Sequence, residues 1–140
     1  MTPSGTMRAV ALAVLAGCYS PQLAPCTVTC GEESPCPADL TCGADSYCHA
    51  AGDDETCHAI LTVNVSGDGL VSSAPTGIEC TPLQTTCSME FTGGTQVTLT
   101  ESAFNGTTFM GWTGDACAGS MNATCTFELD ISMTLDATFD

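Results

Sequence analysis

The chain has 140 residues and a formal net charge of −15 at pH 7, because one Lys or Arg residue stands against 16 Asp and Glu residues. The one basic residue is Arg8. Nucleic acids and anionic membrane surfaces are bound through cationic side chains, so this composition argues against both as partners.

The first 17 residues have the pattern of a secretory signal peptide, in which Arg8 precedes an apolar run at 9–16. That run is too short to span a bilayer as a helix. It leads into Leu-Ala-Gly-Cys at 15–18, which resembles a bacterial lipobox. The resemblance implies cleavage before Cys18 and lipidation of its thiol. The alternative is an ordinary cleaved signal that leaves Cys18 as an unmodified thiol.

The chain contains 11 cysteines, and ten remain when Cys18 is set aside. An even number of cysteines in an exported chain predicts disulfides, here five. The candidates are Cys26, Cys30, Cys36, Cys42, Cys48 and Cys57 in one group, and Cys80, Cys87, Cys117 and Cys125 in the other. Spacing favours the local pairs Cys80–Cys87 and Cys117–Cys125, whereas the first group allows 15 pairings that the sequence does not distinguish.

The segment 18–58 is rich in cysteine and proline and poor in apolar residues, so we expect a loop-rich structure that depends on cross-links. Zinc is the rival use of its cysteines, with His49 and His58 as further ligands. No C-x-x-C pair is present, and zinc thiolates would compete with oxidation outside the cytoplasm, so no metal or other cofactor is expected. We expect both histidines to be exposed loop residues. The acidic run 53–55 lacks the spacing of a calcium loop and is expected to be a solvated turn.

From residue 59 onward, apolar and polar residues alternate with the period of two that is typical of strands. The clearest runs are 61–65, 97–100, 126–129 and 131–139, and Gly67-Asp68-Gly69 has the composition of a tight hairpin turn. The predicted fold class is therefore mainly β, a small antiparallel domain stapled by disulfides. We expect Trp112 to pack in the core with its N–H bonded to a backbone carbonyl. The alternative is an exposed ring on which sugars stack.

Several elements recur in an order that carries a family resemblance. They are Gly67-x-Gly69-x-Val71, Ser73-x-Pro75-x-Gly77-Ile78-x-Cys80, Cys87-x3-Phe91-x2-Gly94-Thr95-x-Val97, Phe109-x-Gly111-Trp112-x-Gly114, and the closing Ala137-Thr138-Phe139. Over residues 60–139 this series resembles the divergent InlB B-repeat of bacterial surface proteins. It departs from the repeat mainly at 81–84, where the link between paired cysteines is longer. The resemblance implies a compact β domain, with a β-grasp-like arrangement as one option, a structural or interaction role and no catalytic residues.

These observations predict a signal peptide at 1–17, a lipid-anchored cysteine-rich segment at 18–58 and a β domain at 59–140. The expected function is that of a non-catalytic cell-envelope lipoprotein, held in a membrane that is expected to be the outer one and directed at an envelope protein or a glycan. The chain has no G-x-S-x-G motif and no lysine-containing phosphate loop, so we expect no enzyme. The alternative is an acidic binding protein for divalent cations or a cationic partner.

Overall fold

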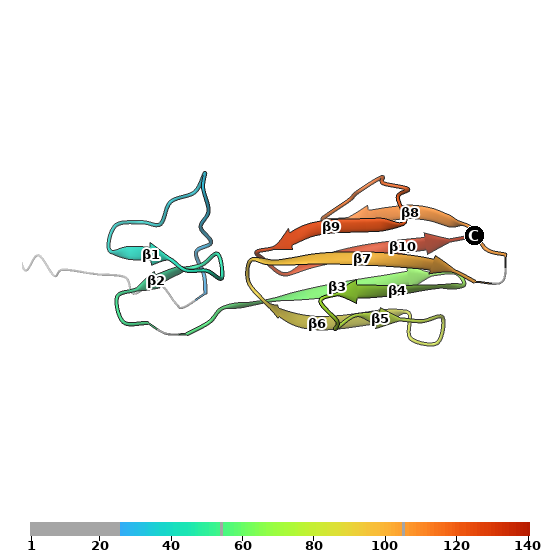
Figure 1. Ribbon diagram of the computed structural model, residues 1–140, viewed down its shortest axis with the longest axis horizontal. Helices are drawn as coiled ribbons and strands as arrows, with labels where there is room; N and C mark the ends of the chain where they lie inside the picture. The colour runs from blue at the N-terminus through green and yellow to red at the C-terminus, as the bar shows by residue number, and fades with distance from the viewer. Residues whose placement is uncertain (1–25, 54, 105) are drawn as a thin grey trace, which may run out of the picture.

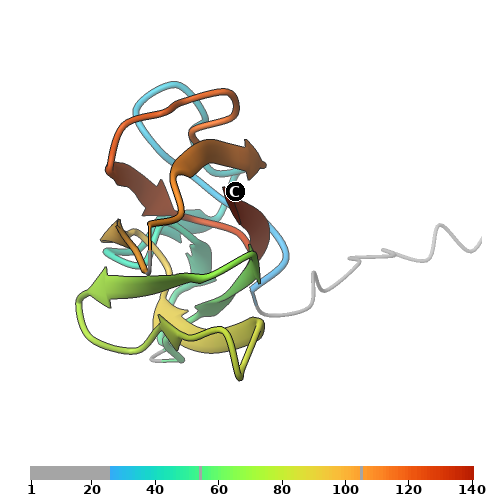
Figure 2. The ribbon, with the colours of Figure 1, turned by 90° about the vertical axis from the view of Figure 1, so that its right-hand side faces the viewer.

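The structure is a computed structural model that describes residues 26–53, 55–104 and 106–140. The expected signal peptide and Cys18 lie outside the described residues. The described ranges contain ten strands and no helix (Figures 1 and 2). Within them, no helix has the length and apolar character needed to cross a membrane. The mainly β fold class predicted from the alternating pattern is confirmed.

Two parts follow one another along the long axis of the molecule (Figure 1). The head, residues 26–57, contains one short antiparallel hairpin of β1 (Leu40–Cys42) and β2 (Cys48–Ala50). The sandwich, residues 58–140, contains two four-stranded sheets. In order across the sheets, the first consists of β6 (Thr86–Thr92), β3 (His58–Ser66), β10 (Met133–Phe139) and β8 (Phe109–Gly114), and the second of β5 (Glu79–Cys80), β4 (Gly69–Ala74), β7 (Thr95–Ala103) and β9 (Thr124–Leu129).

The centre of the first sheet is formed by the first and last strands of the sandwich. Strands β3 and β10 pair in parallel, from Leu61 opposite Met133 to Ser66 opposite Thr138. Every other neighbouring pair of strands in both sheets is antiparallel. A parallel pair cannot be joined by a tight turn, so the rest of the sandwich is the connection between these two strands.

The two sheets bury one face each, and the alternating residues of the sequence form the core between them. The side chains of Leu61, Val63, Leu99 and Leu135 are fully buried. Trp112 is also fully buried, and its Nε1–H donates a 2.8 Å hydrogen bond to the carbonyl oxygen of Asn122. The predicted core role of Trp112 is therefore confirmed, and the alternative of an exposed sugar-stacking ring is wrong.

Two local expectations fail. Gly67-Asp68-Gly69 does not close a hairpin, because β3 and β4 belong to different sheets and the turn carries the chain from one sheet to the other. Composition shows that a turn is tight but not which strands it joins. Ile131 precedes β10 and is 56% exposed, so the alternation expected from 131 begins only at Met133.

The two disulfides of the sandwich lie at its opposite sides. Cys80–Cys87 joins β5 to β6, the edge strands on one side. Cys117–Cys125 joins the segment after β8 to β9, and β8 and β9 are the edge strands on the other side. These are the local pairs that spacing favours. The resemblance left room for a β-grasp-like arrangement, whereas the strands form two packed sheets with no helix in the described residues.

Gly67 offers a direct test of the turn between the two sheets. Its φ is +90°, and an added Cβ would collide with the carbonyl oxygen of Phe139 at the end of β10. We expect Gly67→Ala to lower the free energy of unfolding by about 2–4 kcal/mol, from the unfavourable φ and the overpacking together. Gly119→Ala is the matched control, because Gly119 also has a positive φ of +77° but an added Cβ there meets nothing within 4 Å. Urea denaturation with intact disulfides measures both, and equal losses would contradict this close packing.

Candidate functional site

The head is seated on the turn between β6 and β7. The ring of Tyr47 is buried, and an added Cβ on Gly93 would lie 2.8 Å from its Cε2 atom. The Gly93 N–H donates a 3.0 Å hydrogen bond to the carbonyl oxygen of Cys57. The segment around Asp45 and Tyr47 therefore packs closely on Gly93, which has no side chain that would hold the two parts apart.

Asp45 is a buried polar residue at this junction, with an exposed fraction of 5%. Its carboxylate accepts hydrogen bonds from the backbone N–H groups of Cys57 at 2.8 Å and Tyr47 at 3.3 Å. The Nε2 atom of His49 lies 2.8 Å from the Asp45 Oδ1 atom. A buried carboxylate with three donors is satisfied, as a charge removed from water must be.

These contacts change the pKa values of both side chains. Burial on its own would raise the pKa of Asp45, but the hydrogen bonds from Cys57, His49 and Tyr47 outweigh it and hold the pKa below its ordinary value of 3.8. The hydrogen bond to Asp45 is the main reason that the pKa of His49 lies above 6.5, with Asp53 contributing in the same direction. The pair therefore favours carboxylate and imidazolium together.

His49 was expected to be an exposed loop residue, and that expectation is wrong. It lies in β2, and its side chain is 12% exposed between the carboxylates of Asp45 and Asp53. Its Nδ1 atom is 3.6 Å from Asp53 Oδ2, while Asp53 Oδ1 accepts a hydrogen bond from the Glu55 N–H. His58 begins β3 and is exposed, with Nδ1 3.8 Å from Glu90 Oε1.

The six cysteines of the head form three disulfides, Cys26–Cys57, Cys30–Cys42 and Cys36–Cys48. Their sulfur atoms are thus committed to covalent bonds and are not thiolate ligands for zinc. The sulfur atoms of Cys30, Cys36 and Cys42 lie close together because two of the bridges are adjacent. The connectivity places Cys26, the first described residue, beside Cys57, the residue that precedes the sandwich.

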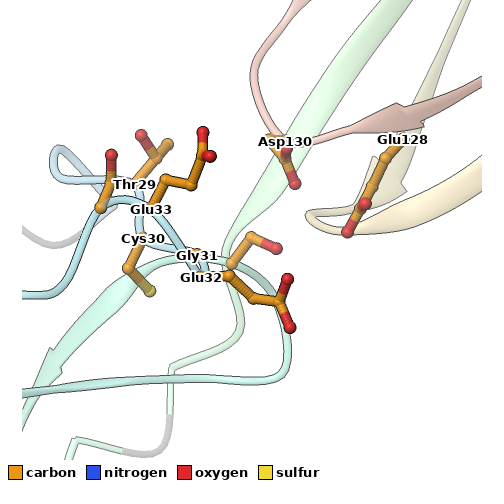
Figure 3. A pocket seen from close by; sticks show the side chains of 9 residues that line it. Thr29, Cys30, Gly31, Glu32, Glu33, Glu128 and Asp130 are labelled. Carbon is orange, nitrogen blue, oxygen red and sulfur yellow. The ribbon is translucent and has the colours of Figure 1, made fainter.

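An acidic pocket of about 600 Å³ lies where the head faces the sandwich (Figure 3). Glu32 and Glu33 reach it from the head, and Glu128 and Asp130 from the end of β9 and the residues after it. The Oδ1 atom of Asp130 is shielded from solvent and has no hydrogen-bond partner among the described residues. Burial, followed by the charges of Asp130 and Asp45, raises the pKa of Tyr47. The junction thus concentrates negative charge contributed by both parts of the chain.

Sequence reasoning missed both the Asp45–His49 pair and the acidic pocket. The pair had a local signal in its spacing of four residues, but nothing in the sequence marked Asp45 as the buried member of the acidic set. The pocket had no local signal, because residues 32–33 and 128–130 meet only through the packing of the head on the sandwich.

Comparison with known proteins gives no match: no protein-family model, no curated protein and no solved structure is significantly similar to the chain.

The Asp45–His49 pair predicts a pH optimum of stability. The raised pKa of His49 means that its contribution is complete below 6.5 and is lost as pH rises through the folded-state pKa. The lowered pKa of Asp45 means that its contribution is complete above 3.8 and is lost as pH falls through the folded-state pKa. We therefore expect the pair to stabilise the fold most between these two values.

His49→Gln provides the control, because an amide can still donate a hydrogen bond to Asp45 but does not titrate. Melting temperatures measured from about pH 6 to about pH 9 should fall more steeply for the parent chain than for this variant. Parallel curves would show that His49 is not the titrating group.

Proposed function

We propose that this chain is a non-catalytic lipoprotein of the bacterial cell envelope, anchored through acyl chains on Cys18 and presenting the sandwich as an interaction or structural module. One observation carries the proposal: all ten cysteines after Cys18 are paired in five disulfides. Such bonds form and persist in oxidising compartments. Cys18 is then the one cysteine of the chain with another fate, and its position after an apolar run is that of a lipidated residue.

The arrangement of the histidines supports a role without catalysis. His49 is held by the carboxylates of Asp45 and Asp53, and His58 lies beside Glu90. A hydrolytic site would instead place the imidazole against a hydroxyl or thiol nucleophile. The resemblance of residues 60–139 to the InlB B-repeat points the same way, since it brings no catalytic residues. We place the anchor in the outer membrane and the partner among envelope proteins or glycans.

The intact mass of the protein from detergent-extracted membranes tests this proposal. Trypsin does not digest the mature chain, because no Lys or Arg follows Arg8. We expect a chain that begins at Cys18, carries the mass of the acyl groups and takes up alkylating reagent only after reduction. In cells, Cys18→Ser should release the protein from the membrane fraction. An unmodified Cys18, or thiols that alkylate without reduction, would overturn the proposal.

The acidic pocket supports a second candidate function, the binding of a cationic partner. Four carboxylates, those of Glu32, Glu33, Glu128 and Asp130, line it, and no Lys or Arg exists in the described residues to neutralise them. A lysine-rich segment would supply the missing positive charge and donate hydrogen bonds to the exposed carboxylates of Glu32, Glu33 and Glu128. Electrostatic attraction of this kind raises the association rate and weakens with added salt.

Calorimetry separates this candidate from simple cation binding. We expect heat on titration with a lysine-rich peptide at moderate salt, and a several-fold loss of affinity in the double variant Glu32→Gln, Glu33→Gln. Glu79→Gln with Glu90→Gln is the matched control, because it removes the same charge from exposed positions that do not line the pocket. An equal loss in both variants would assign the attraction to net charge alone. Heat with calcium chloride but not with peptide would favour divalent cations instead.

A further inference from the structure

The disulfide Cys26–Cys57 joins the two ends of the head directly to each other. It closes residues 27–56 into a covalent loop, and its two Cα atoms are 5.4 Å apart. Tension applied from the N-terminal side therefore passes from Cys26 through the sulfur atoms to Cys57 and does not extend the head. The next residue, His58, is the first of β3.

The far end of the sandwich completes the path. Strand β10 runs parallel to β3 and ends at Phe139, so the residue that leaves β10 lies at the opposite end of the ladder from His58 (Figure 1). Tension between Cys57 and Asp140 pulls the two adjacent strands along their length in opposite directions. The hydrogen bonds of a ladder loaded in this way share the load and must break together. In a ladder loaded at one end they break one at a time.

The flanking strands reinforce this pair. Strand β3 is also paired with β6 from His58 to Asn64, and β10 with β8 from Leu135 to Phe139. A row of side chains links the four strands on the outer face, because Thr86 donates to Asn64 at 2.9 Å, Asn64 donates to Asp136 at 2.8 Å and Thr113 donates to Asp136 at 3.4 Å. Neither loaded strand is an edge strand, so neither peels away without breaking two ladders.

From this geometry we propose that the sandwich is a load-bearing module, in which the Cys26–Cys57 bridge delivers tension to β3 and the parallel β3–β10 ladder resists it in shear. The proposal extends the envelope role: a protein fixed to a membrane at one end and to a partner at the other is exposed to tension between them. The proposed lipid anchor supplies the fixed point for that load, but the resistance itself depends only on the disulfide and the ladder.

Single-molecule pulling on the mature chain tests the resistance. Handles at the two ends of a Cys18→Ser chain, with all five disulfides intact, load the ladder in shear. In the comparison geometry, one handle stays at the C-terminus and the other is attached through an azide-bearing residue at position 108. Thr108 and Asp140 exchange backbone hydrogen bonds, so these positions adjoin and the load opens β8 from β10 at one end. We expect a rupture force several-fold higher between the ends at the same loading rate, whereas an equal or lower force would overturn the proposal.

The role of the bridge is tested by Cys26→Ser with Cys57→Ser. We expect an additional extension at low force, as the head opens first. The sandwich should then rupture at the same force as in the parent protein. Extension of the head before rupture in the parent protein would overturn the load path. If this variant does not fold, pulling the parent protein with its disulfides intact still tests the load path, because it shows whether the head extends before the sandwich ruptures. If the sandwich resists shear but Cys18 is not acylated in cells, the load-bearing role of the ladder stands, but the membrane is not its fixed point.

Discussion

The constraint on which this structure depends is the lack of basic side chains after Arg8. The only nitrogen cation available to the described residues is protonated histidine, and each ion pair seen there has His49 or His58 as its positive member. Cohesion must therefore come from apolar burial between the sheets, from backbone ladders and from covalent bonds. The five disulfides oppose the mutual repulsion of 16 carboxylates, because they restrict the unfolded chain, a contribution commonly about 2–4 kcal/mol for each bridge.

The pairing of β3 with β10 determines how the remaining sandwich is arranged. Each of these strands is buried on its inner face, with Leu61, Val63, Leu135 and Ala137 fully excluded from solvent. Strand β3 is flanked by β6 and β10, so β4 cannot pair beside it and joins the second sheet, and the parallel pairing brings the C-terminal ends of β3 and β10 together. This is why the turn at Gly67 crosses between sheets and why the carbonyl of Phe139 lies directly against it.

The sequence predicted the parts of the fold that local chemistry determines. The period of two identified the strands at 61–65, 97–100 and 126–129 and, within the run 131–139, the strand that begins at Met133, and the short spacings of Cys80–Cys87 and Cys117–Cys125 favoured the pairs that form. Which sheet each strand joins depends on contacts between distant residues, and no local pattern encodes it. Asp45 illustrates the same limit at the site: it is one carboxylate among 16 in the sequence, and only the folded structure brings it against His49 and the Cys57 N–H.

Cys57 makes three of the contacts that hold the junction together. Its side chain closes the head through Cys26, its N–H is held by Asp45 and its carbonyl accepts the Gly93 N–H from the turn between β6 and β7. A backbone unit fixed on both sides in this way has no free torsion to act as a hinge, so the head is expected to keep its orientation on the sandwich. The acidic pocket exists only in that orientation, since its carboxylates come from both parts.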